Sequence, residues 1–138
     1  MSSLLNAGPK PRVSNVVDSS ALLALILGEP GSDFVEASLE QGAFVSSVNL
    51  AEVIAKLSES QDEAQVRRSL LTVKFETVPF AEDHAWRTAA LRSSTRSLGL
   101  SLGDRACLAL AQALGLPALT ADRRWAETDF GVEVVLCR

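Results

Sequence analysis

Four acidic side chains occupy similar places relative to the strands that the sequence predicts. Asp18 directly follows the β-branched run VSNVV, and Asp122 directly follows LPALTA. Glu52 and Asp104 each lie in the first turn of a predicted helix, and the helix of Glu52 follows the strand AFVSSV. In a parallel sheet the carboxyl ends of the strands lie at one edge, where open α/β folds bind ligands. The pattern therefore predicts that these carboxylates meet at that edge.

Each acid alone also suits the start of a helix, where a carboxylate caps backbone N–H groups and meets the positive end of the helix dipole. Ser101 and Asp104 have the S-x-x-D spacing of a capping box, and Asn49 and Glu52 have the same spacing. The other two acids could each be an N-cap, worth ~1 kcal/mol. On a helical wheel, Glu52 lies opposite the apolar stripe of its helix, so its place at the edge rests on being in the first turn. This stripe consists of Leu50, Val53, Ile54 and Leu57.

Capping explains the four acids less well as a group, because carboxylates at one edge repel one another. Two unit charges ~4 Å apart interact by ~4 kcal/mol at an effective dielectric of 20. Raised pKa values or bound cations could offset this repulsion, and carboxylates are hard oxygen ligands suited to Mg²⁺ or Mn²⁺. Such ions orient and activate water in phosphodiester hydrolysis. The acids therefore predict a metal-dependent hydrolase of phosphodiester bonds.

The elements that must position these acids alternate along the chain. Strands are expected at 13–17, 43–48, 75–80, 116–121 and 132–137. Helices are expected at 20–28, 32–42, 49–60, 62–74, 81–98 and 101–115, with a helical turn at 123–128. This alternation predicts an α/β fold with a mostly parallel sheet. The helix at 101–115 carries the apolar stripe Cys107, Leu108 and Ala111 behind Asp104, so it should be buried.

Length and composition predict one domain. The chain has 138 residues, 47% of them hydrophobic, and no apolar run approaches the ~18 residues of a membrane span. We expect a flexible tail at 1–12, which lacks the pattern of a signal peptide, a domain at 13–138, and a cytoplasmic location. Two cysteines, Cys107 and Cys137, form neither a disulfide framework nor a metal cluster and are expected to be reduced.

Positive charge gathers in one segment although the chain carries a net charge of −4. Residues 84–124 hold six arginines and two acids, and 10 of the 13 basic residues in the chain are arginine, which binds phosphate well. The six are candidates for holding an RNA backbone: Arg87, Arg92, Arg96, Arg105, Arg123 and Arg124. A solvated basic helix face explains the same segment.

Several classes of enzyme are excluded. His84 is the single histidine, so a two-histidine nuclease is impossible, and the sequence contains no G-x-S-x-G, phosphate-loop or G-x-G-x-x-G motif. A receiver-like signalling domain also has acids at strand ends, but it needs a late lysine, and the last one here is Lys74. A haloacid-dehalogenase-type phosphatase needs D-x-D, where this chain has Asp18-Ser19-Ser20.

Four segments together resemble the successive motifs of the PIN-domain family: VVDSSALLALILGEPG, SSVNLAEVIAKL, GLSLGDRACLALA and ALTADRRWAE. They most resemble its VapC branch, the toxin ribonucleases of bacterial toxin–antitoxin pairs. The resemblance covers about residues 13–137 and implies a three-layer fold with a five-stranded parallel sheet flanked by helices. It also implies Mg²⁺- or Mn²⁺-dependent endoribonuclease activity, with transfer RNA a common target in the family.

The resemblance assigns roles to the same four acids. Asp18 and Asp104 would bind the principal ion, while Glu52 and Asp122 would complete the cluster or orient the attacking water. A small hydroxyl residue in the first motif and a threonine before the last acid match two further positions, Ser20 and Thr120. These hydroxyl groups would position an acid or the substrate, although local bonds to backbone explain them equally well. Glu127 or Asp129 could assist the fourth acid.

The resemblance also implies partners. VapC-type toxins typically form homodimers and are silenced by a cognate VapB-like antitoxin, whose C-terminal segment can bring a basic side chain to the acids. The run Ala21–Leu27 and the helix from Ser32 are candidate docking surfaces, and core packing is the simpler explanation for each residue. Two alternatives to a nuclease remain: a receiver-like signalling domain and a non-catalytic PIN-like binding module.

Overall fold

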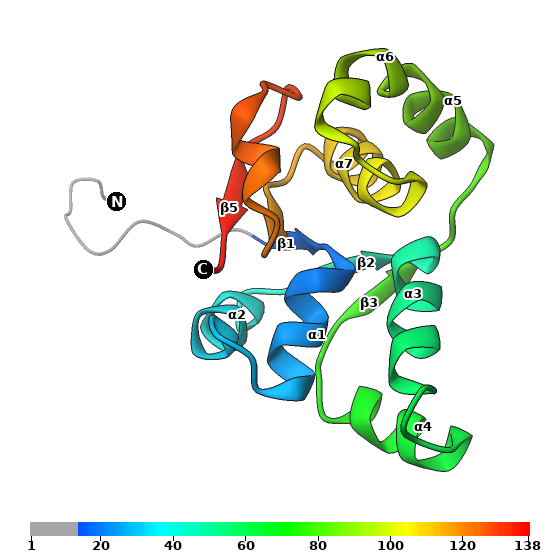
Figure 1. Ribbon diagram of the computed structural model, residues 1–138, viewed down its shortest axis with the longest axis vertical. Coiled ribbons are helices and arrows are strands. Elements are labelled where there is room, and N and C mark those ends of the chain that lie inside the picture. The colour runs from blue at the N-terminus through cyan, green and yellow to red at the C-terminus, as the bar shows by residue number, and fades with distance from the viewer. Residues whose placement is uncertain (1–13) are drawn as a thin grey trace, which may run out of the picture.

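The computed structural model describes residues 14–138, so the expected tail at 1–12 lies outside the described residues. Five strands form one parallel sheet in the order β3-β2-β1-β4-β5 (Figure 1). The strands are β1 (Asn15–Val17), β2 (Ala43–Ser46), β3 (Glu76–Val78), β4 (Ala118–Thr120) and β5 (Val134–Leu136). The α/β class, the parallel sheet and its five strands are therefore confirmed.

Helices and short 3₁₀ turns connect and cover the strands. The α-helices are α1 (Ser19–Leu27), α2 (Ser32–Leu39), α3 (Ser47–Leu57), α4 (Glu63–Leu71), α5 (Glu82–Ala90), α6 (Arg92–Thr95) and α7 (Leu102–Leu114). The 3₁₀ turns are η1 (Arg96–Leu98) and η2 (Arg123–Glu127). Between residues 14 and 138, no helix is long and apolar enough to cross a membrane.

The strand order reverses at β1, which lies at the centre of the sheet. The chain adds β2 and β3 on one side of β1, then returns to add β4 and β5 on the other. Val16 pairs with Phe44 of β2 and with Ala118 of β4. The carboxyl end of β1 is thus the topological switch point, where open α/β sheets form their ligand-binding crevice.

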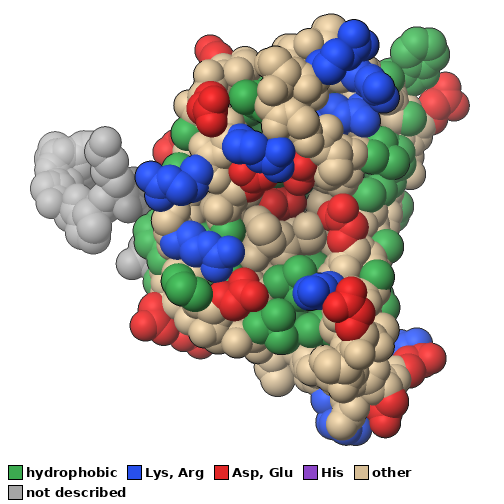
Figure 2. Space-filling view, viewed as in Figure 1, with side chains coloured by type: hydrophobic (Ala, Val, Ile, Leu, Met, Phe, Trp, Pro, Cys, Tyr) green, Lys and Arg blue, Asp and Glu red, His purple; other side chains and the backbone are tan. Residues whose placement is uncertain are grey.

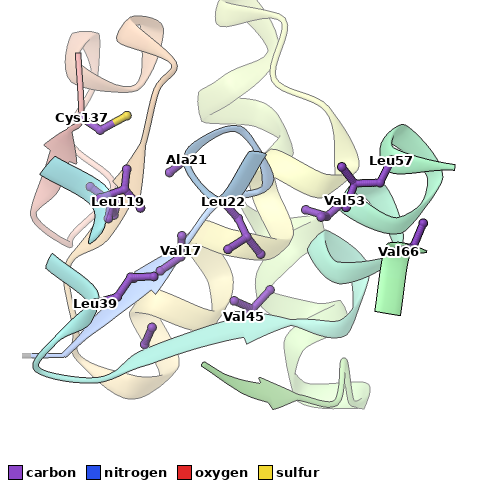
Figure 3. Close-up of a cluster of buried hydrophobic side chains, with 12 residues drawn as sticks. Val17, Ala21, Leu22, Leu39, Val45, Val53, Leu57, Val66, Leu119 and Cys137 are labelled. Carbon is purple, nitrogen blue, oxygen red and sulfur yellow. The ribbon is translucent and has the colours of Figure 1, made fainter. Parts of the chain in front are cut away.

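Alternating side chains of the central strands build a core on each face of the sheet. Val17, Val45 and Leu119 face the core beneath α1 to α4, where Leu22 and Val53 pack against them (Figure 3). The intervening strand residues belong to a second core with α7 and the segment from α5 to η1. This alternation places helices on both faces, the three-layer arrangement that a buried parallel sheet requires.

Helix α7 is buried along most of its length. Cys107, Leu108 and Ala111 have no exposed surface, as predicted from their stripe, and Ala109 and Leu110 on its other sides are buried too. Helices α3 and α5 and strand β1 all contact α7, which explains why the burial extends around the helix. The first turn of α7 is therefore held rigidly beside the carboxyl end of β1.

The single helix expected at 81–98 is wrong in detail, because the segment divides into α5, α6 and η1. The hydroxyl groups of Ser94 and Thr95 donate to the carbonyl of Leu91, at 3.2 and 2.8 Å. Serine and threonine side chains that bond to preceding carbonyls compete with the helical ladder. The run of hydroxyl residues thus explains the break.

Helix α3 begins earlier than expected, and its N-cap is Ser46, whose hydroxyl accepts from the backbone N–H of Val48 at 3.3 Å. Asn49 lies inside the helix, so the capping role expected for it is wrong. The predicted apolar stripe of α3 is also incomplete, because Ile54 is 39% exposed while Val53 and Leu57 are buried.

Candidate active site at the carboxyl edge of the sheet

Asp18 lies at the switch point, directly after β1, and its side chain is buried. Its backbone N–H donates to the carbonyl of Leu119 in β4 at 2.9 Å. Its Oδ2 accepts hydrogen bonds from the hydroxyl groups of Ser20 at 2.6 Å and Thr120 at 2.9 Å. Although Asp18 stands at the N-cap position of α1, its side chain makes no capping bond. Capping therefore does not explain this carboxylate.

The pKa of Asp18 is raised to about 6. Burial is the main cause, since it disfavours the charged form, and the negative charges of Asp104 and Glu52 raise the pKa further. The hydrogen bonds from Ser20 and Thr120 act in the opposite direction. Asp18 is thus a buried carboxylate whose charge is opposed by two neighbouring acids.

Ser20 and Thr120 join the ends of β1 and β4 around Asp18. Their hydroxyl oxygens lie 3.2 Å apart. The Ser20 hydroxyl accepts from the backbone N–H of Ala121 at 3.0 Å, and the Thr120 hydroxyl accepts from that of Asp122 at 3.0 Å. Both residues therefore bond to the acid, but only Thr120 also makes the expected local bond to backbone, because the backbone partner of Ser20 belongs to the segment after β4.

Glu52 faces the same region from the first half of α3. Its Oε1 accepts from the Ser19 hydroxyl at 2.9 Å and from the amide of Asn49 at 3.1 Å. The Ser19 hydroxyl also lies 3.5 Å from Oδ1 of Asp18, so it links the two carboxylates. The same Asn49 amide donates to the carbonyl of Gly103 in α7 at 2.9 Å. This network fixes α3 and α7 against each other beside Asp18.

Ser19, Asn49 and Gly103 are site residues that the sequence analysis did not identify. Gly103 carried a usable signal, because glycine costs stability inside a helix unless a close backbone approach requires it. Asn49 was expected to cap its helix, but its side chain instead donates to Glu52 in the same helix and to Gly103 in α7. Ser19 stands out only by its place next to Asp18.

Asp104 lies in the first turn of α7 and closes the predicted capping box with Ser101. The Ser101 hydroxyl accepts from the Asp104 backbone N–H at 3.2 Å, and the Asp104 Oδ2 accepts from the Ser101 N–H at 2.9 Å. The side chain of Asp104 is 17% exposed. The capping box is confirmed, and it holds Asp104 where its charge raises the pKa of Asp18.

The buried thiol of Cys107 lies close enough to the same three acids to be affected by their charges. Burial raises the pKa of this thiol well above its usual value, and the charges of Asp18, Asp104 and Glu52 raise it further. Three carboxylates from β1, α7 and α3 thus surround one region, as predicted from the strand and helix ends. Cys107 and Cys137 are both free thiols.

Asp122 follows β4 at the same edge, but its carboxylate is bound by Arg124. The Nε of Arg124 donates to Oδ1 at 3.0 Å, and its Nη2 donates to Oδ2 at 2.6 Å. Arg124 hydrogen bonding is the main reason why the pKa of Asp122 is lowered. Asp122 also caps η2, because its Oδ1 accepts from the Arg124 backbone N–H at 3.0 Å. Of the two further acids, Glu127 is close enough for its charge to help raise the pKa of Arg124, and Asp129 accepts from the backbone N–H of Gly131 at 2.8 Å.

The donor set suits a hard divalent cation, since Asp18, Glu52 and Asp104 converge and offer only carboxylate oxygens. Within residues 14–138, however, no three acidic, histidine or cysteine side chains already have the arrangement that holds a metal ion. Asp104 is occupied by its capping bond, and Arg124 holds Asp122. The residues therefore fit Mg²⁺ or Mn²⁺ in chemistry, and the side chains must adjust to bind it.

The arginines predicted to hold RNA differ in how exposed their side chains are. Figure 2 shows acidic side chains at the centre of one face, partly beneath a basic one, with other basic side chains around them. Arg87, Arg92 and Arg96 are exposed on α5, α6 and η1. Arg105 differs from the expectation of an RNA contact, because it is 9% exposed and its Nη1 donates to the carbonyl of Thr88 at 3.0 Å. Arg105 ties α7 to α5.

The PIN-domain family model matches residues 16–131. No curated protein sequence matches the chain. A toxin–antitoxin complex from Klebsiella pneumoniae has a similar structure, with a TM-score of 0.72, 24% identity, and coverage of 90% of this chain and 98% of that one.

Two further solved structures share the fold. VapBC2 from Rickettsia felis, bound to a promoter DNA fragment, has a TM-score of 0.71 at 18% identity, covering 88% of this chain and 97% of that one. VapC20 from Mycobacterium tuberculosis, a toxin that cleaves the sarcin–ricin loop, has a TM-score of 0.67 at 16% identity, covering 81% and 93%. Together with the match over most of the sequence, they show that this chain belongs to the PIN-domain family.

Proposed function

We propose that this protein is a metal-dependent endoribonuclease and the toxin of a VapBC-type toxin–antitoxin pair. The observation that carries the proposal is the convergence of Asp18, Glu52 and Asp104 around the end of β1. Negative charges gathered around a buried carboxylate are costly without a cation, and PIN domains generally use divalent metal ions. The fold is shared with a ribonuclease toxin, VapC20, which supports RNA as the substrate class.

Asp18 and Asp104 would hold the principal Mg²⁺ or Mn²⁺ ion. A bound ion of this kind lowers the pKa of water and neutralises charge on the phosphodiester. Glu52 would complete the ligand set or orient the attacking water, and Asp122 would do the same once freed from Arg124. Ser20 and Thr120 would keep Asp18 turned towards the ion through the bonds to its Oδ2.

RNA would approach over the exposed arginines. The stretch of chain that contains Asp104 and Asp122 also contains four exposed arginines: Arg87, Arg92, Arg96 and Arg123. Contacts between these guanidinium groups and phosphates would weaken with salt, because they release condensed counterions. Transfer RNA is one candidate target.

An antitoxin would bind over α1 and α2. Leu27 and Phe34 are 46% and 47% exposed, and they lie on the two helices expected to dock a partner. A groove of about 470 Å³ lies between these helices and the segment after α4, and apolar side chains line it in equal number with polar or charged ones. Ala21, Leu22 and Ala24 are fully buried, so core packing is correct for that part of the run. A VapB-like antitoxin and a homodimer remain proposals for this chain.

Cleavage of RNA by the purified protein tests the function directly. Wild-type protein should cleave RNA in Mg²⁺ or Mn²⁺ and lose this activity in excess EDTA. Asp104→Asn should remove cleavage while keeping the fold, because an asparagine oxygen can still accept the capping bond from Ser101. Full activity of this variant, or full activity in EDTA, would exclude the mechanism.

Calorimetric titration with Mn²⁺ distinguishes the enzyme from the alternatives. The enzyme should bind Mn²⁺, and Asp18→Asn should weaken the binding. A folded protein that binds no Mn²⁺ would instead favour a non-catalytic binding module. Mass gain on treatment with a small phosphodonor would favour a receiver-like domain.

A further inference from the structure

Arg124 makes more contacts with the acid site than any other basic residue that the structure describes. Its Nε and Nη2 bind both carboxylate oxygens of Asp122, with three distances between 2.6 and 3.2 Å. Its Nη2 also lies 3.9 Å from Oδ2 of Asp104. One guanidinium therefore carries positive charge to two of the four acids.

The other end of the guanidinium is anchored in the loop before α7. Nη1 donates to the carbonyl of Leu98 at 2.7 Å and to that of Gly99 at 3.4 Å. The Asp122 carboxylate directs both of its oxygens towards the arginine, so neither is free to bind another cation without breaking this pair. Bidentate arginine–carboxylate pairs are among the stronger hydrogen-bonded pairs.

The side chain is nevertheless placed to move. Arg124 is 47% exposed, and Asp122 and Asp104 are 20% and 17% exposed. Water screens a pair at such positions, which limits what the pair contributes and makes its exchange possible. A buried arginine such as Arg105 has no comparable freedom.

From these contacts we propose that Arg124 is an internal counter-ion of the acid site, and that it competes with the divalent cation for Asp122. The arginine neutralises Asp122 and part of the charge of Asp104. Binding of the cation with all four acids requires the guanidinium to leave Asp122. The cation therefore binds fully only to molecules in which Arg124 is unpaired. Its apparent affinity is the intrinsic affinity multiplied by the fraction of such molecules. This inference rests on the proposed metal-dependent function.

Arg123 provides a matched control. It is the neighbouring residue in η2, and its replacement changes the net charge equally. Its Nη1 donates to the carbonyl of Arg138 at 2.9 Å, and no bond to the four acids is present among the described residues. Arg123→Ala thus measures the effect of removing a nearby positive charge alone.

Mn²⁺ affinity, measured by calorimetry, tests the proposal in the full-length protein. We expect Arg124→Ala to bind Mn²⁺ about tenfold more tightly than wild type, and Arg123→Ala to stay within about twofold. Arg124→Lys keeps the charge but loses the bidentate fork, so its affinity should fall between those of wild type and Arg124→Ala. Circular dichroism in EDTA checks that each variant is folded.

A second measurement observes the Arg124–Asp122 pair directly and depends on neither RNA cleavage nor a binding constant. The Nε–H of Arg124 should give a distinct arginine resonance in ¹⁵N NMR spectra, identified by its loss in Arg124→Lys. This resonance should shift when Mg²⁺ is added and should not shift in Asp104→Asn, which lacks a principal ligand. An unchanged resonance at saturating Mg²⁺ would overturn the competition.

The outcomes separate this inference from the proposed function. If wild type binds Mn²⁺ and Arg124→Ala binds it no more tightly than Arg123→Ala, only the counter-ion role is wrong. If neither wild type nor Arg124→Ala binds Mn²⁺, the metal site itself fails and both proposals fall. Binding by Arg124→Ala alone would support both.

Discussion

The carboxylate of Glu52 lies against the backbone of Gly103, in the space that a β-carbon at residue 103 would occupy. The two residues come from different helices, α3 and α7, and Asn49 bonds to both of them. Glycine at this position is therefore explained by the acid that it admits. It also shows how closely α3 and α7 approach at the site.

Gly103→Ala should displace Glu52 without weakening the fold. The group in the way is the end of a flexible side chain, and alanine is favoured over glycine within helices by ~1 kcal/mol. We expect a melting temperature equal to or above that of wild type, together with a loss of RNA cleavage of about 10–100-fold, the usual effect of disturbing a ligand's surroundings. Cleavage assays and thermal melts check both.

A double-mutant comparison shows whether the alanine acts through Glu52. If it does, Gly103→Ala should cost nothing further in the background of Glu52→Ala, because the displaced group is already absent. Equal losses in both backgrounds would mean that Gly103 matters for another reason.

Stability of the metal-free protein should depend on Asp18 and pH. The pKa of Asp18 is raised from 3.8 to about 6 in the folded state. Between these two pH values, Asp18 is therefore protonated in the folded protein and ionised in the unfolded chain. The stabilising effect of that proton is complete below pH 4 and is lost as pH rises through 6. The shift corresponds to on the order of 3 kcal/mol.

Urea unfolding in EDTA tests this dependence. Asp18→Asn lacks the titration, so its stability relative to wild type should increase between pH 4 and pH 7.5. Ser38→Ala, which changes no titratable group, is the control and should keep a constant difference from wild type. A constant difference for Asp18→Asn as well would show that burial and the neighbouring acids do not act on Asp18 as described.

Ser20 should set the pH at which the site binds its cation. A carboxylate must be ionised to bind metal, so Mn²⁺ affinity should fall as pH drops through the pKa of Asp18. The Ser20 hydrogen bond lowers that pKa, and Ser20→Ala should therefore move the midpoint to higher pH. Calorimetry across pH 5–8 measures the midpoint. Ser38→Ala, which loses only a bond within α2 to the carbonyl of Phe34, should leave this midpoint unchanged.

Sequence patterns predicted the sheet and three of the convergent acids because both depend on local rules. Alternating strands and helices fix a parallel sheet, and an acid after a strand or in a first helical turn lies at the carboxyl edge. Asp18, Glu52 and Asp104 follow these rules. The break at Leu91 was missed because a periodic pattern does not show which hydroxyl groups turn back to bond carbonyls.

Contacts between distant segments lay beyond the same rules. The bonds from Asn49 to Gly103 and from Arg124 to Leu98 join residues far apart in sequence, and no periodicity records them. Charge was also a poor guide to exposure, since Arg105 counts as a basic residue in any sum yet is buried.

Arg105 should affect stability, whereas exposed Arg96 should affect RNA binding. Arg105→Ala leaves the carbonyl of Thr88 without its partner and removes the packing between α7 and α5, so it should cost about 2–3 kcal/mol of unfolding free energy.

Arg96→Ala should change stability by less than about 0.5 kcal/mol. In the Asp104→Asn background, it should weaken RNA binding and reduce the salt slope by about 1. Urea unfolding and salt-dependent binding measure the two effects. An Arg96→Ala variant with unchanged RNA affinity would remove η1 from the proposed RNA surface, and a stable Arg105→Ala variant would return Arg105 to the candidates.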